Sequence, residues 1–106
     1  MAHTIHGAGA ISSPRYPTDL RVVITAAVYD RMEKDSEFRF FVSKSLARHM
    51  RGDWGEIEDS DKVLNGATFE VLAGATSAYE HPTHPKLYVI TDPGHSVVTV
   101  LFPDEY

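Results

Sequence analysis

The chain has 106 residues, 42% of them apolar, so we expect one domain with a folded core, because two separate cores would each be too small. Its net charge is −5 and its basic residues are scattered, which argues against direct nucleic-acid binding, since that needs a continuous basic surface. The lack of cysteine excludes disulfides and thiol chemistry, and no apolar run approaches the roughly 20 residues of a membrane span, so we expect a cytoplasmic protein without a membrane partner.

The first part of the chain changes character near residue 18. Residues 1–17 are rich in glycine, alanine, serine and proline and show no sustained period, so we expect a flexible lead-in before a single domain at 18–106. The β-branched run at residues 20–24 predicts a strand. Thr25 can then cap a short helix over residues 26–34.

Two further helices are predicted in the middle of the chain. Ser36 can cap a helix that ends at Gly52, and acidic residues at 58–61 suit the start of another helix, which reaches residue 73. Apolar side chains at helical spacing predict the buried faces. In the second helix the buried positions are Phe38, Phe41, Val42, Leu46 and His49, and in the third they are Val63, Leu64, Ala67 and Val71.

The last third of the sequence has the period of strands. Residues 75–80, 86–91 and 96–102 predict three strands, and the short turns between them favour antiparallel neighbours. The helices need an apolar sheet face to cover. We therefore predict an α+β fold with about three helices packed on one face of a three- to four-stranded, mainly antiparallel sheet.

The segment Arg48-His49-Met50-Arg51-Gly52-Asp53-Trp54-Gly55 and the acidic residues after it form the main candidate for a partner-binding site. Tryptophan and arginine dominate binding hot spots, because they bury large areas with few rotamers lost. The alternative is a tryptophan that closes the core where two helices meet. The candidate partner-binding residues are Arg48, Arg51, Asp53, Trp54, Glu56, Glu58, Asp59 and Asp61. Tyr106, at the end of the tail, can dock on its own sheet or on a partner.

The motifs Arg48-His49, Gly52-Asp53-Trp54-Gly55, Asp61 with Asn65, Ser77 with Tyr79, and the tail from residue 87 occur together. Over residues 22–106 the chain resembles a family of short bacterial "plasmid-related" proteins of mobile elements, which typically read RHxxGDWG, SxY and TTVLxPEEY. The resemblance implies a bacterial cytoplasmic setting and carries no biochemical activity.

The sequence offers one candidate catalytic pair and one candidate metal site, each with a structural alternative. His49 and Asp53 are four residues apart at a helix end and can form an imidazole–carboxylate pair, or each can hydrogen-bond locally. His81, His84 and His95 can supply three imidazoles to a zinc ion, or His81 and His84 can belong to a solvated turn. No Gly-x-Ser-x-Gly or phosphate-binding loop is present. We expect no enzymatic activity, no metal and no cofactor.

Three functional hypotheses follow from these features. The first is a non-enzymatic binding protein of a mobile element that inhibits a CRISPR or restriction effector by occluding its nucleic-acid-binding surface. The second is a small metal-binding or hydrolytic enzyme that uses His49 and Asp53, or His81, His84 and His95. The third is a homodimer that pairs through an exposed strand edge.

Overall fold

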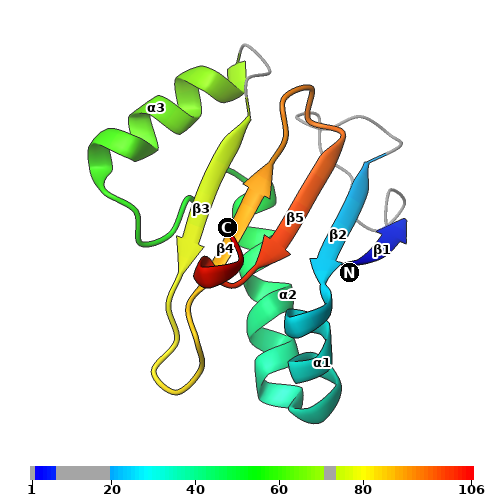
Figure 1. The fold of residues 1–106 in the computed structure, drawn as a ribbon. Coiled ribbons are helices and arrows are strands. Elements are labelled where there is room, and N and C mark those ends of the chain that lie inside the picture. The colour runs from blue at the N-terminus through cyan, green and yellow to red at the C-terminus, as the bar shows by residue number, and fades with distance from the viewer. Residues whose placement is uncertain (1, 7–19, 71–73) are drawn as a thin grey trace.

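The computed structural model describes residues 2–6, 20–70 and 74–106, and over these residues the α+β prediction is confirmed (Figure 1). The described strands form one five-stranded sheet in the order β1-β2-β5-β4-β3. Only β2 and β5 pair in parallel, and the other neighbours are antiparallel. The strands are β1 (Ala2–His6), β2 (Arg21–Thr25), β3 (Ala75–Tyr79), β4 (Leu87–Thr91) and β5 (Val97–Leu101).

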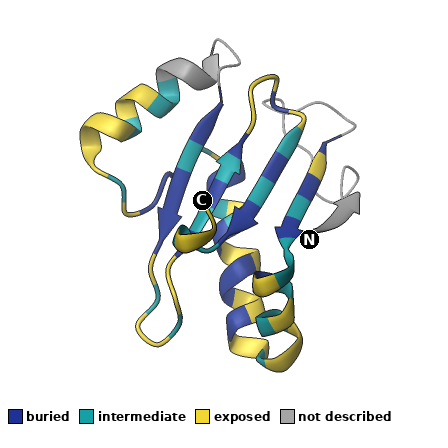
Figure 2. Cartoon of the chain, in the orientation of Figure 1, coloured by how far each residue is buried: buried dark blue, intermediate teal, exposed yellow. Residues whose placement is uncertain are grey.

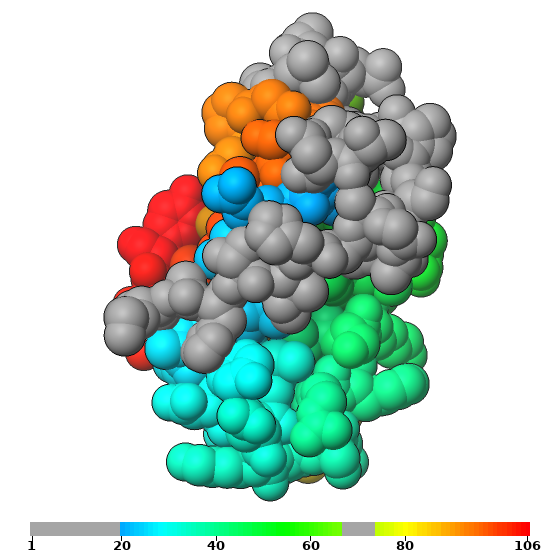
Figure 3. Space-filling view, turned by 90° about the vertical axis from the view of Figure 1, so that its right-hand side faces the viewer, coloured from blue at the N-terminus to red at the C-terminus, as the bar shows by residue number. Residues whose placement is uncertain are grey.

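Two helices cover one face of this sheet. α1 (Ala26–Lys34) and α2 (Ser36–Met50) lie behind the sheet in Figure 1 and side by side in Figure 3. The short helix η1 (Pro103–Glu105) and the C-terminus lie on the opposite side (Figure 3). No helix among the described residues has the length and apolar character needed to cross a bilayer.

Side-chain caps set the starts of α1 and α2. The Val28 N–H donates to the Thr25 hydroxyl at 3.5 Å, as the sequence predicted. The cap of α2 is Asp35 instead of Ser36, because the Asp35 carboxylate accepts the N–H of Phe38 at 3.1 Å. That contact lowers the pKa of Asp35.

The core lies between the helices and the sheet. The strands alternate between side chains buried against the helices and half-buried side chains on the other face. Phe38, Phe41 and Val42 of α2 are buried as predicted, and Leu46 is partly buried against the same cluster. The strand residues of the core are Val22, Ile24, Ala75, Tyr79, Leu87, Val89, Val98 and Val100.

The predicted buried face of α3 (Asp59–Glu70) is wrong for the residues that can be compared. Val63 is 75% exposed and Leu64 is 58% exposed, and Figure 2 shows the start of α3 largely exposed. The residue that binds the sheet is polar: the Asn65 amide donates to the Thr76 carbonyl at 2.6 Å and accepts the Thr76 N–H at 3.3 Å. The side chains of Ala67 and Val71 lie outside the described part, as do residues 71–73.

The start of the chain differs from the predicted lead-in. Residues 2–6 form β1, which pairs antiparallel with β2 in the register Ile5↔Val22. The pairing uses backbone groups offered by the edge of β2, so it needs no periodic pattern in β1. Residues 7–19 lie outside the described part.

Candidate partner-binding site

An ion pair closes the corner between α2 and the following loop. Arg48 donates two hydrogen bonds to the Asp53 carboxylate, from Nε to Oδ2 at 2.7 Å and from Nη2 to Oδ1 at 3.1 Å. The paired guanidinium lowers the pKa of Asp53, and its carbon lies 4.8 Å from the ring centroid of Tyr79. The Tyr79 hydroxyl donates to the Asp53 carbonyl. Arg48 and Asp53, both predicted to bind a partner, are thus engaged within the chain.

The Trp54–Glu56 segment runs along β3 and closes its outer edge. The Ala78 N–H donates to the Trp54 carbonyl at 3.3 Å, and the Glu56 N–H donates to the Ala78 carbonyl at 2.7 Å. Gly55 has a φ of +74°, and a Cβ there would lie 2.0 Å from the Ala78 carbonyl oxygen. The Asn65 side chain satisfies the outward backbone groups of Thr76 in the same way, so the outward N–H and carbonyl groups of both Thr76 and Ala78 have partners. This edge is therefore not available for pairing with a second chain.

His49 and Trp54 belong to the buried part of the same corner. His49 is fully buried, with Nδ1 against the Ser77 hydroxyl and Nε2 2.6 Å from the Thr91 hydroxyl. Burial lowers the pKa of His49 to about 3, so the ring is neutral. Of the two alternatives for His49 and Asp53, the imidazole–carboxylate pair does not form: hydroxyl groups hold the imidazole and Arg48 holds the carboxylate.

Trp54, included among the candidate partner-binding residues, has the alternative role of closing the core. Its side chain is 7% exposed and belongs to the core, where its ring packs edge-on against His49 at 5.4 Å between centroids. A residue already buried in the free protein cannot serve as an exposed hot spot. Three other residues that carry the resemblance also bond within the chain: Ser77 with His49, Tyr79 with Asp53, and Asn65 with Thr76.

The acidic residues after Trp54 are exposed, and three of them share one hollow. It measures about 390 Å³ and lies between the start of α3, strands β3 and β4, and the C-terminus. We call it the acidic hollow, and its lining residues are Glu56, Ile57, Glu58, Asp61, Thr76, Ala78, Lys86, Tyr88 and Tyr106.

Two tyrosines form the aromatic side of the acidic hollow. Tyr106 is 77% exposed and packs edge-on against Tyr88 at 6.1 Å between centroids. The ammonium of Lys86 lies 6.0 Å from the centroid of the Tyr88 ring. The sequence suggested docking of Tyr106 but did not place Tyr88 beside it.

Two of the predicted partner-binding residues lie outside the acidic hollow. Asp59 pairs with Lys62 at 3.7 Å, and neither Asp59 nor the exposed Arg51 lines the hollow.

The three-histidine site, one of the two alternatives for these residues, does not form. His81 and His84 lie in the β3–β4 loop, whereas His95 lies in the β4–β5 turn. Strand β4 separates the two turns, which occur at opposite ends of the sheet (Figure 1). The third potential ligand near His81 and His84 is Glu37, at the start of α2.

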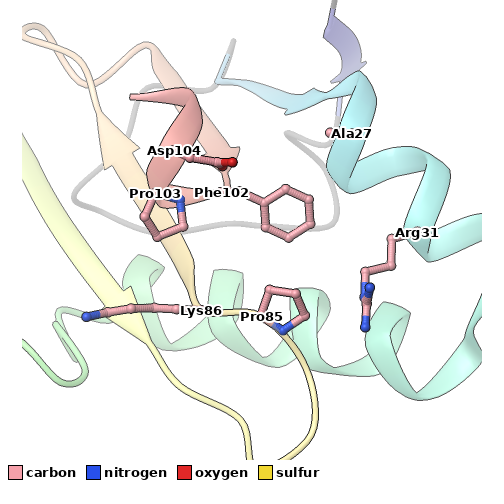
Figure 4. Close-up of a pocket in the computed structure, with 7 residues that line it drawn as sticks. All are labelled: Ala27, Arg31, Pro85, Lys86, Phe102, Pro103 and Asp104. Carbon is pink, nitrogen blue, oxygen red and sulfur yellow. The ribbon is translucent and has the colours of Figure 1, made fainter.

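A larger hollow of about 460 Å³ lies between α1 and the C-terminal segment (Figure 4). The ring of Phe102 extends toward Arg31, and Lys86 points away from them. The polar residues that line this larger hollow are Arg31, Lys86 and Asp104. One carboxylate among cations does not make the nucleophile and base that hydrolysis requires.

Comparisons with protein-family models, with curated proteins and with solved structures find no match to this chain. The resemblance to plasmid-related proteins therefore stays a prediction, and the candidate site rests on its geometry.

Proposed function

We propose that this protein is a non-enzymatic binding protein that presents the acidic hollow to a basic surface of a protein partner. The observation that supports this most is the convergence of Glu56, Glu58 and Asp61 with two tyrosines in one open hollow. The corner residues Arg48, Asp53 and Trp54 do not line the hollow and do not contact the partner; they stabilise the loop that carries Glu56.

The chemistry of the hollow suits an arginine or lysine side chain. A cation that enters it meets three carboxylates and the rings of Tyr88 and Tyr106, which line the same hollow. An aromatic face attracts a cation by about 0.5–1 kcal/mol at exposed sites, and by more once water is excluded. The ammonium of Lys86 already lies 6.0 Å from the Tyr88 ring centroid, so a partner's cation would displace Lys86 from that ring or contact Tyr106.

The partner class that fits is a protein whose basic residues normally hold nucleic acid. Carboxylates on a small protein can occupy those residues and so exclude the phosphate backbone. We infer that the partner is a CRISPR or restriction effector of a bacterial host, that the encounter occurs in the cytoplasm, and that the protein belongs to a mobile element. The resemblance to plasmid-related proteins supports this setting.

The test is inhibition of DNA cleavage by purified effectors. Reversing two charges of the hollow, with Glu58→Lys and Asp61→Lys, should abolish inhibition because the partner's cations then face like charges. The matched control reverses Asp30 and Glu33, two exposed residues of α1 at the other side of the sheet, and should retain inhibition.

Thermal unfolding of each variant separates loss of binding from loss of folding. Inhibition should weaken as salt rises, because the exposed charges are screened over about 10 Å at 0.1 M salt. Cleavage that continues unchanged in a large excess of the wild-type protein would refute the inhibitor proposal.

A further inference from the structure

The β3–β4 loop brings two imidazoles to a carboxylate of α2. One ligand atom from each of Glu37, His81 and His84 lies within 4.8 Å of the others. The His84 Nε2 atom lies 2.9 Å from the Glu37 Oε1 atom and 3.7 Å from the Asp35 Oδ2 atom. Ligand atoms bonded to one tetrahedral ion at about 2.0–2.1 Å lie roughly 3.3 Å apart, so only small side-chain movements are needed.

Packing already orients both imidazole rings. The His84 ring lies against Phe38 at 5.3 Å between centroids, and the His81 ring lies against Phe41 at 5.0 Å. The side chain of His84 is only 5% exposed, whereas that of Glu37 is 66% exposed. The two rings are therefore held in place, and the carboxylate can move to complete a site that stays open to solvent.

Contacts at both imidazoles compete with a metal ion. The Thr83 N–H donates to His81 Nδ1 at 3.1 Å, which leaves Nε2 as the free side of that ring for the ion. The Arg31 Nη2 group donates to His84 Nδ1 at 3.0 Å, so Nδ1 accepts and the proton of a neutral ring is on Nε2, facing Glu37. A metal ion bound at Nε2 takes the place of that proton, which moves to Nδ1. Arg31 then has to turn away, and the hollow of Figure 4 beside it provides the room.

We propose that Glu37, His81 and His84 form a site for a first-row divalent transition-metal ion such as Zn²⁺. Two imidazoles and one carboxylate are the donors that such ions accept, whereas Mg²⁺ and Ca²⁺ prefer oxygen alone. Asp35 adds a second negative charge near the ion. The bound ion would join the β3–β4 loop to the first turn of α2. This site is separate from the acidic hollow and independent of the proposed function.

The test is calorimetric titration of the full-length, untagged protein with Zn²⁺ and with Co²⁺. The expected result is one ion per chain and a melting temperature that rises with the ion concentration. Glu37→Gln and His84→Gln should each lower the affinity by about 10-fold or more, because even the loss of an outer partner of a metal ligand costs about 10–100-fold. The matched control is Glu80→Gln, which removes an exposed carboxylate next to His81 and should leave the affinity unchanged.

Arg31→Met gives a result of the opposite sign. It keeps an apolar side chain beside Phe38 but removes both the competing donor and a positive charge, so Zn²⁺ should bind more tightly. This variant distinguishes a ligand role from a general effect on folding. Titration curves that are the same for the wild type, Glu37→Gln and His84→Gln would show that the ions bind elsewhere and would overturn the proposal. The same conclusion follows if the wild type binds no ion.

Discussion

The buried His49 makes the stability of this protein depend on pH already between about 7 and 5, above the range in which ordinary carboxylates titrate. Burial lowers the pKa of His49 from 6.5 to about 3, so the unfolded chain binds a proton at a higher pH than the folded chain. The contribution is therefore fully present above pH 6.5 and is lost as the pH falls toward 3. Each pH unit within this window is worth up to about 1.4 kcal/mol, so lowering the pH from about 7 to about 5 should cost about 2 kcal/mol.

Urea unfolding at a series of pH values measures this loss. Trp54 is the one tryptophan of the sequence and lies in the core beside His49, so its fluorescence reports unfolding. His49→Gln keeps a donor and an acceptor between the hydroxyls of Ser77 and Thr91, and it should remove this pH dependence above about pH 5. Asp53 contributes separately, because its lowered pKa makes stability fall only below its ordinary value of 3.8. Equal pH slopes for the wild type and His49→Gln between pH 7 and pH 5 would refute the reasoning.

Three other changes test the closed edge of β3 by thermal and urea unfolding. Gly55→Ala should destabilise the fold by about 2 kcal/mol or more, because it combines a strained positive φ with a clash against the Ala78 carbonyl. Gly66→Ala, in α3 with nothing within 4 Å of the new Cβ, should instead stabilise by up to about 1 kcal/mol, and losses of similar size at both glycines would contradict this account. Asn65→Ala should cost about 1–3 kcal/mol because it removes both bonds to the Thr76 backbone, and an unchanged melting temperature would show that the edge does not depend on Asn65.

Local patterns were enough to predict most elements of the fold. The β-branched run before Thr25 and the capping hydroxyl itself predicted β2 and α1, and glycine at 52 marked the end of α2. The short turns of the last third predicted three antiparallel neighbours. These signals succeed because each depends on residues a few positions apart.

The errors concern contacts between residues far apart in the chain. His49 and Asp53 are close in sequence, but the partners of His49 come from β3 and β4, 28 and 42 residues away. The exposure of Val63 follows from the Asn65 amide facing β3, which no apolar period reveals. Glu37 joins His84 across 47 residues, a contact that no local pattern reveals.

The most direct test of the central claim is affinity capture from a lysate of a bacterial host, with the wild type compared against Glu58→Lys/Asp61→Lys at matched folded fractions. We expect the wild type to retain a nucleic-acid-binding effector that moderate salt or added DNA releases, and the charge-reversed protein to retain none of it. Equal retention of the same partner by both proteins would contradict a function based on the acidic hollow.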